Sequence, residues 1–225
     1  MIHIDQIVRS KRRTLALIVI PDGRVVVRAP LGASDAAIRT WVETKADWLK
    51  ARLAAVPPRE TFAEGRSLWY LGQACPLRLV DAARPALTFR EGVFYLGRNW
   101  LPQAEAVFTR WYRAQAARVL GAQLAQRAAQ LGYPYRRLRI SAARTRWGSC
   151  SSTGTISLTW RLVMAPPEVA DYVIVHELVH TRHPNHSPAF WAQVAAHLPD
   201  YRQRAQWLKS QGAKLALPRG ESPYN

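Results

Sequence analysis

The segment 170–191 limits what this chain can fold into more than any other, because it places the pattern H-E-x-x-H in an apolar stretch. The stretch follows Pro166-Pro167, and proline is favoured in the first turn of a helix. Residues four apart on a helix lie one above the other, so His176 and His180 would present two imidazoles to one point. Burying them among valines is costly without a metal or polar partners. The pattern therefore predicts a zinc-binding helix.

The residues around these two histidines complete a catalytic type of zinc site. The helical pitch rotates Glu177 by about 100° from His176, which places it near the metal as a general base and not as a ligand. His186 follows the helix-breaking Pro184 and would return across the helix end as a third ligand. We therefore expect one Zn²⁺ per chain, held by His176, His180 and His186, with one coordination position open.

The chain is strongly basic. Its 225 residues include 32 Lys and Arg against 15 Asp and Glu, a formal net charge of +17, which favours an anionic partner or substrate. No acidic residue lies between Glu105 and Glu168, where ten arginines occur: Arg110, Arg113, Arg118, Arg127, Arg136, Arg137, Arg139, Arg144, Arg146 and Arg161. This interval is either a solvated basic face or a surface that binds nucleotide or nucleic acid.

The cysteines and the apolar runs indicate a cytoplasmic protein. Cys75 and Cys150 are far apart and form no C-x-x-C pattern, so neither a disulfide framework nor a cysteine zinc site is predicted. The apolar run 15–20 is short and leads into Pro21-Asp22-Gly23, which is typical of a hairpin turn and not of a signal peptide. No segment approaches the ~20 apolar residues of a membrane span, so no membrane partner is expected.

The first half of the chain is predicted to be rich in strands, with one helix. Strands are expected over 2–8, 14–20 and 24–29 as an antiparallel meander, and over 67–71, 77–80, 87–90 and 93–96. Ser34 is a suitable cap for a helix over 35–55. Its apolar residues keep a helical spacing and would face the core: Ile38, Trp41, Val42, Trp48, Leu49 and Leu53.

Helical spacing dominates from Leu101 onward. Helices are expected over 102–131, from Pro166 through the H-E-x-x-H pattern, over 188–197 and after Pro199 to about Gln211, with strands over 136–141 and 155–160. The prediction is an α+β fold with a β-rich N-terminal half, 1–97, a mixed helical and β domain, 98–217, and a loose tail, 218–225.

Several motifs together resemble one family. They are Arg146-Trp147-Gly148-Ser149-Cys150-Ser151, then Gly154, Ile156 and Leu158, then His176-Glu177-Leu178-Val179-His180 and His183-Pro184-Asn185-His186-Ser187-Pro188-Ala189-Phe190-Trp191. The chain resembles the YgjP-like metallopeptidases, which are more loosely similar to the SprT-like proteases that act near DNA. The resemblance implies a zincin-like second domain, in which His176, His180 and His186 bind the metal and Glu177 is the catalytic acid/base.

The metzincins share this spacing of three histidines but are excluded by two departures. Their glycine after the second histidine is replaced by His183, and no methionine follows the site to form a Met-turn. The backbone that returns His186 to the site is therefore expected to turn at Pro184-Asn185.

The site favours a zinc-dependent hydrolase, and the bond it cleaves is open. A metallopeptidase would use zinc-bound water, activated by Glu177, to attack a peptide carbonyl, and strand 146–151 or 155–160 would pair with an extended peptide or protein substrate. The arginines also suit a metal-dependent nucleoside triphosphate pyrophosphatase. A nucleic-acid-associated zinc protein is a third possibility, but it gives Glu177 no purpose. The candidates for substrate binding are Arg144, Arg146 and Trp147.

Overall fold

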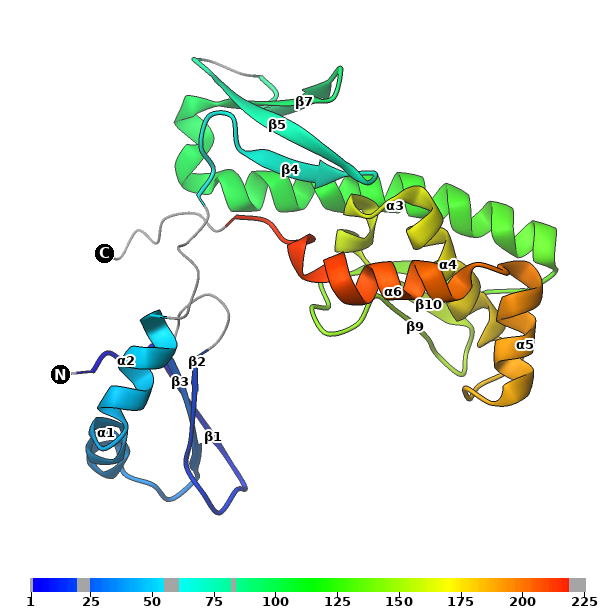
Figure 1. The fold of residues 1–225 in the computed structure, drawn as a ribbon. Helices are drawn as coiled ribbons and strands as arrows, with labels where there is room; N and C mark the ends of the chain where they lie inside the picture. Colours follow the sequence, from blue (N-terminus) through cyan, green and yellow to red (C-terminus); the bar gives the residue numbers. More distant parts are fainter. Residues whose placement is uncertain (1, 20–24, 55–60, 82–83, 219–225) are drawn as a thin grey trace. The chain divides into compact units, whose positions relative to one another are not determined.

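The structure is a computed structural model that describes residues 2–19, 25–54, 61–81 and 84–218. Its contacts divide the chain into two compact units, Met1–Glu60 and Thr61–Asn225 (Figure 1). The boundary predicted from the sequence lies at residue 97 instead. In the structure, the strands before residue 97 contribute to the same hydrophobic cluster as the helices that follow them. Apart from residue 218, the expected tail lies outside the described residues.

The first unit contains a three-stranded sheet of β1 (Gln6–Ser10), β2 (Ala16–Val19) and β3 (Val25–Pro30). The strand order is β1-β3-β2, with β1 parallel and β2 antiparallel to β3. The expected antiparallel meander is therefore wrong. The valines of β3 are buried, whereas β1 is largely exposed, so burial favours β3 in the centre of the sheet. The expected turn at Asp22-Gly23 lies outside the described residues.

The single helix expected over 35–55 is two helices, α1 (Asp35–Glu43) and α2 (Ala46–Ala54). At the break the Thr44 hydroxyl donates to the carbonyl of Trp41 at 2.7 Å, which offers the backbone an alternative to a continued helix. Because α2 follows a new axis, Trp48 and Leu53 are 48% and 38% exposed. The expectation that they face the core is wrong, and only Leu49 of that group is buried on α2.

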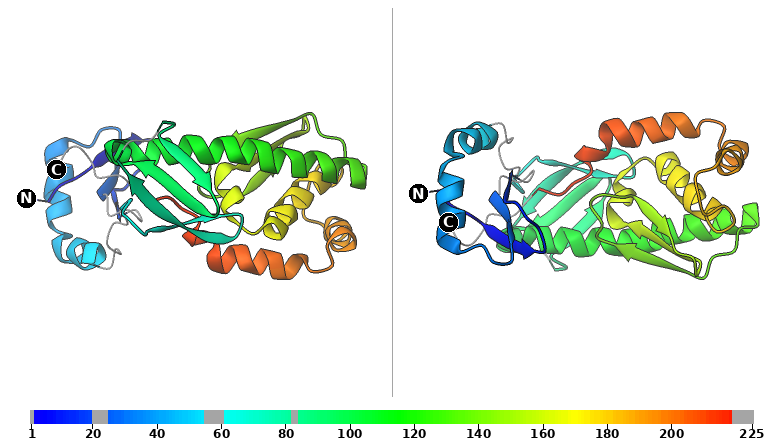
Figure 2. Two further views of the ribbon diagram at one scale, coloured as in Figure 1. Left: turned by 90° about the horizontal axis from the view of Figure 1, so that it is seen from above. Right: turned by 90° about the horizontal axis from the view of Figure 1, so that it is seen from below.

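The second unit begins with a four-stranded sheet and a long helix. The strands are β4 (Ser67–Tyr70), β5 (Gln73–Val80), β6 (Leu87–Arg90) and β7 (Val93–Gly97), in the order β4-β5-β7-β6. The short helix η1 (Arg98–Gln103) contains Pro102, and α3 (Ala104–Leu131) starts after it and ends at Gly132, whose φ of 67° suits glycine. Helix α3 runs along this sheet, as both views of Figure 2 show.

A mixed α/β region follows. Strands β8 (Arg137–Ser141), β9 (Gly148–Cys150) and β10 (Thr155–Thr159) form a sheet in the order β8-β10-β9, with β8 parallel and β9 antiparallel to β10. Next come η2 (Trp160–Met164), α4 (Pro167–Val179), α5 (Pro188–His197), α6 (Tyr201–Gln211) and η3 (Gly212–Lys214). The α+β class is confirmed. Within the described residues, no helix has both the length and the apolar character that crossing a bilayer requires.

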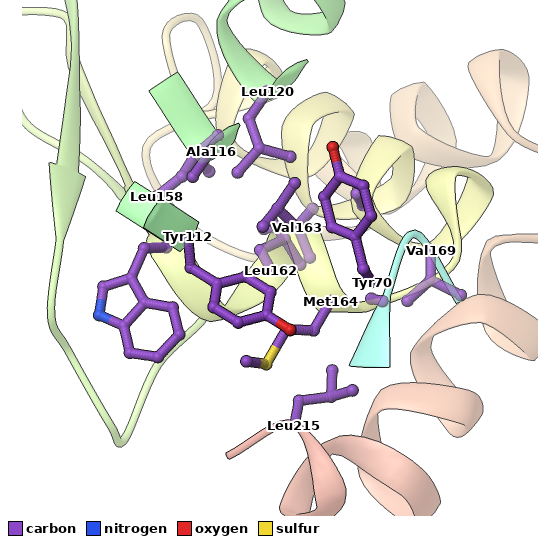
Figure 3. Packing of buried hydrophobic residues seen from close by; sticks show 14 of the residues in the cluster. Tyr70, Tyr112, Ala116, Leu120, Leu158, Leu162, Val163, Met164, Val169 and Leu215 are labelled. Atoms are coloured by element: carbon purple, nitrogen blue, oxygen red, sulfur yellow. The ribbon is translucent and has the colours of Figure 1, made fainter. Parts of the chain in front are cut away.

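The core of the second unit lies between α3 and the η2–α4 segment. Tyr112, Ala116 and Leu120 are fully buried on one face of α3, and Leu162 and Val163 pack in the same cluster (Figure 3). Helix α4 is apolar around most of its circumference because β9, α3, α5 and α6 all contact it. The helix that carries H-E-x-x-H is thus a central element of the second unit.

Candidate metal centre

Helix α4 and its C-terminal end supply three of the four residues predicted for the metal centre and its general base. His176 and Glu177 lie in its last turns, and His180 is the residue at which the helix ends. After it the backbone makes a tight turn, in which the amide of His183 donates to the carbonyl of Val179 at 2.9 Å. Helix α4 therefore ends at His180, the residue that supplies the second imidazole.

The fourth residue, His186, arrives from the loop between α4 and α5. Ser187 caps α5 by accepting a hydrogen bond from the amide of Phe190 at 3.3 Å, which fixes the chain directly after His186. In the structure this segment returns toward the end of α4, as predicted, and Pro184 and Asn185 lie in the connecting loop.

The three imidazoles converge through the same ring atom. Nε2 of His186 lies 3.0 Å from Nε2 of His176 and 3.2 Å from Nε2 of His180, and one ligand atom from each of the three residues lies within 4.8 Å of the others. Zinc–nitrogen bonds of 2.0–2.1 Å in a tetrahedron separate neighbouring nitrogens by about 3.3 Å. The spacing of these nitrogens therefore fits a zinc ion.

Hydrogen bonding and burial keep two of these rings in the form that a metal requires. Nδ1 of His180 lies 3.0 Å from the carbonyl oxygen of His183, which can only accept, so Nδ1 carries the proton and Nε2 is left with a free lone pair. Burial, with added repulsion from the other two histidines, lowers the pKa of His176 to about 3. Burial also lowers the pKa of His180. Both rings are therefore neutral at physiological pH.

Aromatic side chains of α5 support the histidines. Phe190 is fully buried, and its ring centroid lies 4.9, 4.5 and 4.8 Å from those of His176, His180 and His186. Trp191 stacks on His186 with centroids 5.5 Å apart and planes inclined by 25°. His186 is exposed, so this stacking limits the orientations available to its ring.

Glu177 lies in an apolar environment beside the histidines. It is 5% exposed, and burial raises its pKa to about 7, although the positive charge of Arg146 acts in the opposite direction. A carboxylate with a pKa near neutrality can both take a proton from water and return it. This is the property expected of a general base and acid.

Gly148 of β9 provides the space for that carboxylate. A Cβ at this position would lie 2.5 Å from Oε1 and 2.7 Å from Cγ of Glu177, closer than non-bonded atoms approach. Gly148 is not among the site residues predicted from the sequence. The only signal was a glycine within the R-W-G-S-C motif, and its purpose depends on a contact with a residue 29 positions later.

The three candidates for substrate binding lie in different surroundings. Arg146 and Trp147 line a cavity next to β9, and Trp147 also contacts Gly212, where an added Cβ would lie 2.6 Å from the indole ring. Arg144 is exposed and does not line this cavity. Burial raises the pKa of the Cys150 thiol, and the nearby Glu177 carboxylate adds to the effect, which argues against a nucleophilic role for Cys150.

Several arginines of the acid-free interval have structural partners. Arg127 pairs with Asp171, Arg113 donates to the carbonyl of Ile140, and Arg161 donates to backbone carbonyls and stacks on Trp160. These arginines stabilise contacts between elements, so the interval does not act solely as a binding face.

Comparison with known proteins gives one family and a partial structural likeness. Residues 13–211 match the family model described as "YgjP-like, metallopeptidase domain". A search of curated proteins found no match. Among solved structures, the zymogen of abylysin from Pyrococcus abyssi has a TM-score of 0.38 and 23% identity, and covers 41% of this chain and 95% of its own. The zymogen of jannalysin from Methanocaldococcus jannaschii has a TM-score of 0.37 and 18% identity, with the same coverage, 41% and 95%.

The family match spans both units and includes every residue of the candidate metal centre. It extends over most of the 225 residues. This chain therefore belongs to the YgjP-like family of metallopeptidase domains.

Proposed function

We propose that this protein is a zinc-dependent metallopeptidase in which water activated by Glu177 attacks a peptide carbonyl. The observation that carries the proposal is the convergence of three Nε2 atoms beside a buried glutamate with a pKa of about 7. When bound by His176, His180 and His186, a zinc ion would supply Lewis acidity toward water and toward the carbonyl oxygen.

Glu177 would carry out the proton transfers of the reaction. Its carboxylate accepts the proton of the attacking water and delivers it to the amine that leaves. Because Gly148 lies against the carboxylate and the surrounding groups are apolar, the side chain has little freedom to turn away. This positioning supports the role of Glu177 as base and then acid.

Strand β9 is the better of the two strands proposed to pair with the substrate. β10 lies between β8 and β9, so both of its edges are already hydrogen-bonded. β9 pairs only with β10 among the described strands and contacts α4. An extended peptide that added to β9 would therefore lie next to Glu177.

The experiment compares four purified proteins for zinc content and for hydrolysis of an unfolded protein. The wild type is expected to hold about one zinc per chain and to cleave, and Glu177→Gln to hold zinc but lose cleavage. His176→Ala is expected to lose zinc. His183→Ala is its matched control, since His183 contributes a backbone carbonyl and no ring atom to the centre.

Nucleoside triphosphates form a second arm of the same assay. If the protein cleaves triphosphates and no protein substrate, its activity is that of a phosphoanhydride hydrolase and not of a peptidase. Full zinc retention in His176→Ala, or an active Glu177→Gln protein, would remove the proposed ligand or the proposed base.

A further inference from the structure

A polar cavity of about 100 Å³ lies beside the candidate active site, between β8, β10 and the segment that leads into β9. Two arginines, Arg139 and Arg146, line it together with the serines Ser141, Ser149 and Ser157. Among the described residues, no acidic side chain lines it. Its walls therefore offer guanidinium and hydroxyl donors, which are the groups that bind an anion with several oxygens.

The sheet register explains why these side chains gather. Arg139, Ser157 and Ser149 are direct register partners across β8, β10 and β9, so they leave the sheet on the same face. The next row, Ile140, Leu158 and Gly148, points to the other face, where Gly148 meets Glu177. One edge strand thus separates the cavity from the candidate general base.

The two guanidinium groups lack protein partners. Within the described residues, the guanidinium groups of Arg139 and Arg146 make no hydrogen bond or ion pair with the protein, and Arg146 acts on Glu177 through its charge alone. Some other arginines of this unit are paired with a carboxylate, as Arg127 and Arg204 are with Asp171. Positive charges left unpaired in a concave polar site attract an anionic ligand.

We propose that this cavity is a specificity subsite that binds the carboxylate of an Asp or Glu side chain in a peptide lying along β9. The inference rests on the proposed function, since the peptide is placed by the same edge strand. Side chains of an extended peptide alternate between the two faces, so only every second residue reaches the cavity. The residues between them face α4.

The test measures binding, so it does not depend on turnover. Zinc-loaded, full-length Glu177→Gln protein is titrated with fluorescein-labelled peptides that differ only by Glu or Gln at one position, scanned along the sequence. Glu is expected to bind about tenfold more tightly than Gln at alternate positions, as a charge-assisted hydrogen bond at a partly exposed site would give.

Two further substitutions in that protein separate the cavity from the general positive charge. Arg139→Glu is expected to abolish or reverse the preference for Glu. Arg137→Glu makes the same change of charge on the same strand and the same face but outside the cavity, so it should keep the preference. Both arginines are exposed, and the circular dichroism of both variants should match that of the parent protein.

The outcomes distinguish this subsite from the proposed activity. The subsite is overturned if the Glu and Gln peptides bind equally, or if Arg137→Glu and Arg139→Glu lose the preference for Glu to the same extent. Either result holds even if the wild type cleaves both peptides. If the preference for Glu peptides depends on Arg139 but the wild type cleaves no peptide, the result supports the subsite and contradicts the proposed peptidase activity. Arg139-dependent binding of inorganic phosphate without discrimination between the peptides overturns the proposal in favour of a phosphate site.

Discussion

Gly148 links the fold to the proposed chemistry, because the backbone of this residue lies against the proposed general base, Glu177. All three heavy atoms nearest to a Cβ at this position belong to Glu177. Glu177 is buried, so its side chain is surrounded by other protein atoms and not by bulk water. The absence of a side chain at residue 148 thus determines where the carboxylate lies.

Gly148→Ala is expected to reduce peptide hydrolysis about a hundredfold, because a displacement of about 1 Å at a catalytic group costs that much. Zinc content should be unchanged, since the three atoms nearest to the added Cβ belong to Glu177 and none to a proposed metal ligand. Gly121→Ala in α3 is the control: its added Cβ meets only Leu138 Cδ2, at 3.5 Å, and alanine should stabilise the helix by up to about 1 kcal/mol. Kinetics and zinc analysis of both variants check this, and full activity of Gly148→Ala would contradict it.

Among the elements, α4 is held to its neighbours by a buried carboxylate. Asp171 is 4% exposed and accepts hydrogen bonds from Arg127 of α3 at 2.7 and 2.5 Å and from Arg204 of α6 at 3.1 Å. Arg204 also pairs with Asp200 at 2.9 Å. One carboxylate thus joins three helices, and it does so on the helix that carries His176 and Glu177.

Asp171→Asn is expected to lower the free energy of unfolding by about 2 kcal/mol, because it leaves the Arg127 guanidinium without a counterion and the Arg204 guanidinium with Asp200 alone. The loss should be below the ~3–5 kcal/mol of fully buried pairs, since the Arg127 side chain is 31% exposed. Asp200→Asn removes a carboxylate from the same Arg204, but that carboxylate is 45% exposed, so the change should stay below about 1 kcal/mol. Urea denaturation measures both; equal losses would refute the special role of Asp171.

At the scale of the whole molecule, the buried hydrophobic residues that the structure describes form two separate clusters. One comprises Val27, Ala29, Ile38 and Val42 with their neighbours in the first unit. The other extends from Phe62 to Leu215 and includes residues of β4, β5 and β7 as well as α4. Because the clusters share no residue, each unit has a core of its own.

A chain that begins at Thr61 is therefore expected to fold cooperatively and to bind about one zinc. A chain that begins at residue 98, the boundary expected from sequence, loses Leu68, Leu77, Phe94 and Leu96 from the core and should fail to fold. Thermal melting followed by circular dichroism, with zinc analysis, compares the two. Cooperative folding of the shorter chain would restore the sequence-based boundary.

The sequence by itself determined the features that depend on neighbours along the chain. The spacing of His176 and His180 is a property of any helix, and Glu177 follows from the same pitch. The motifs around them also led to the family. Elements with strong periodicity, such as α3 and α5, lie close to their predicted limits, although η1 delays the start of α3.

Only the tertiary structure decided which elements meet. The parallel pairing of β1 with β3, the contact of Gly148 with Glu177, the row of Arg139, Ser157 and Ser149, and the ion pairs of Asp171 all join residues distant in sequence. Periodicity shows which face of an element is apolar, but it does not identify the partner that covers that face. The partner is set by the packing of the whole core, because only there are burial and hydrogen bonding satisfied together.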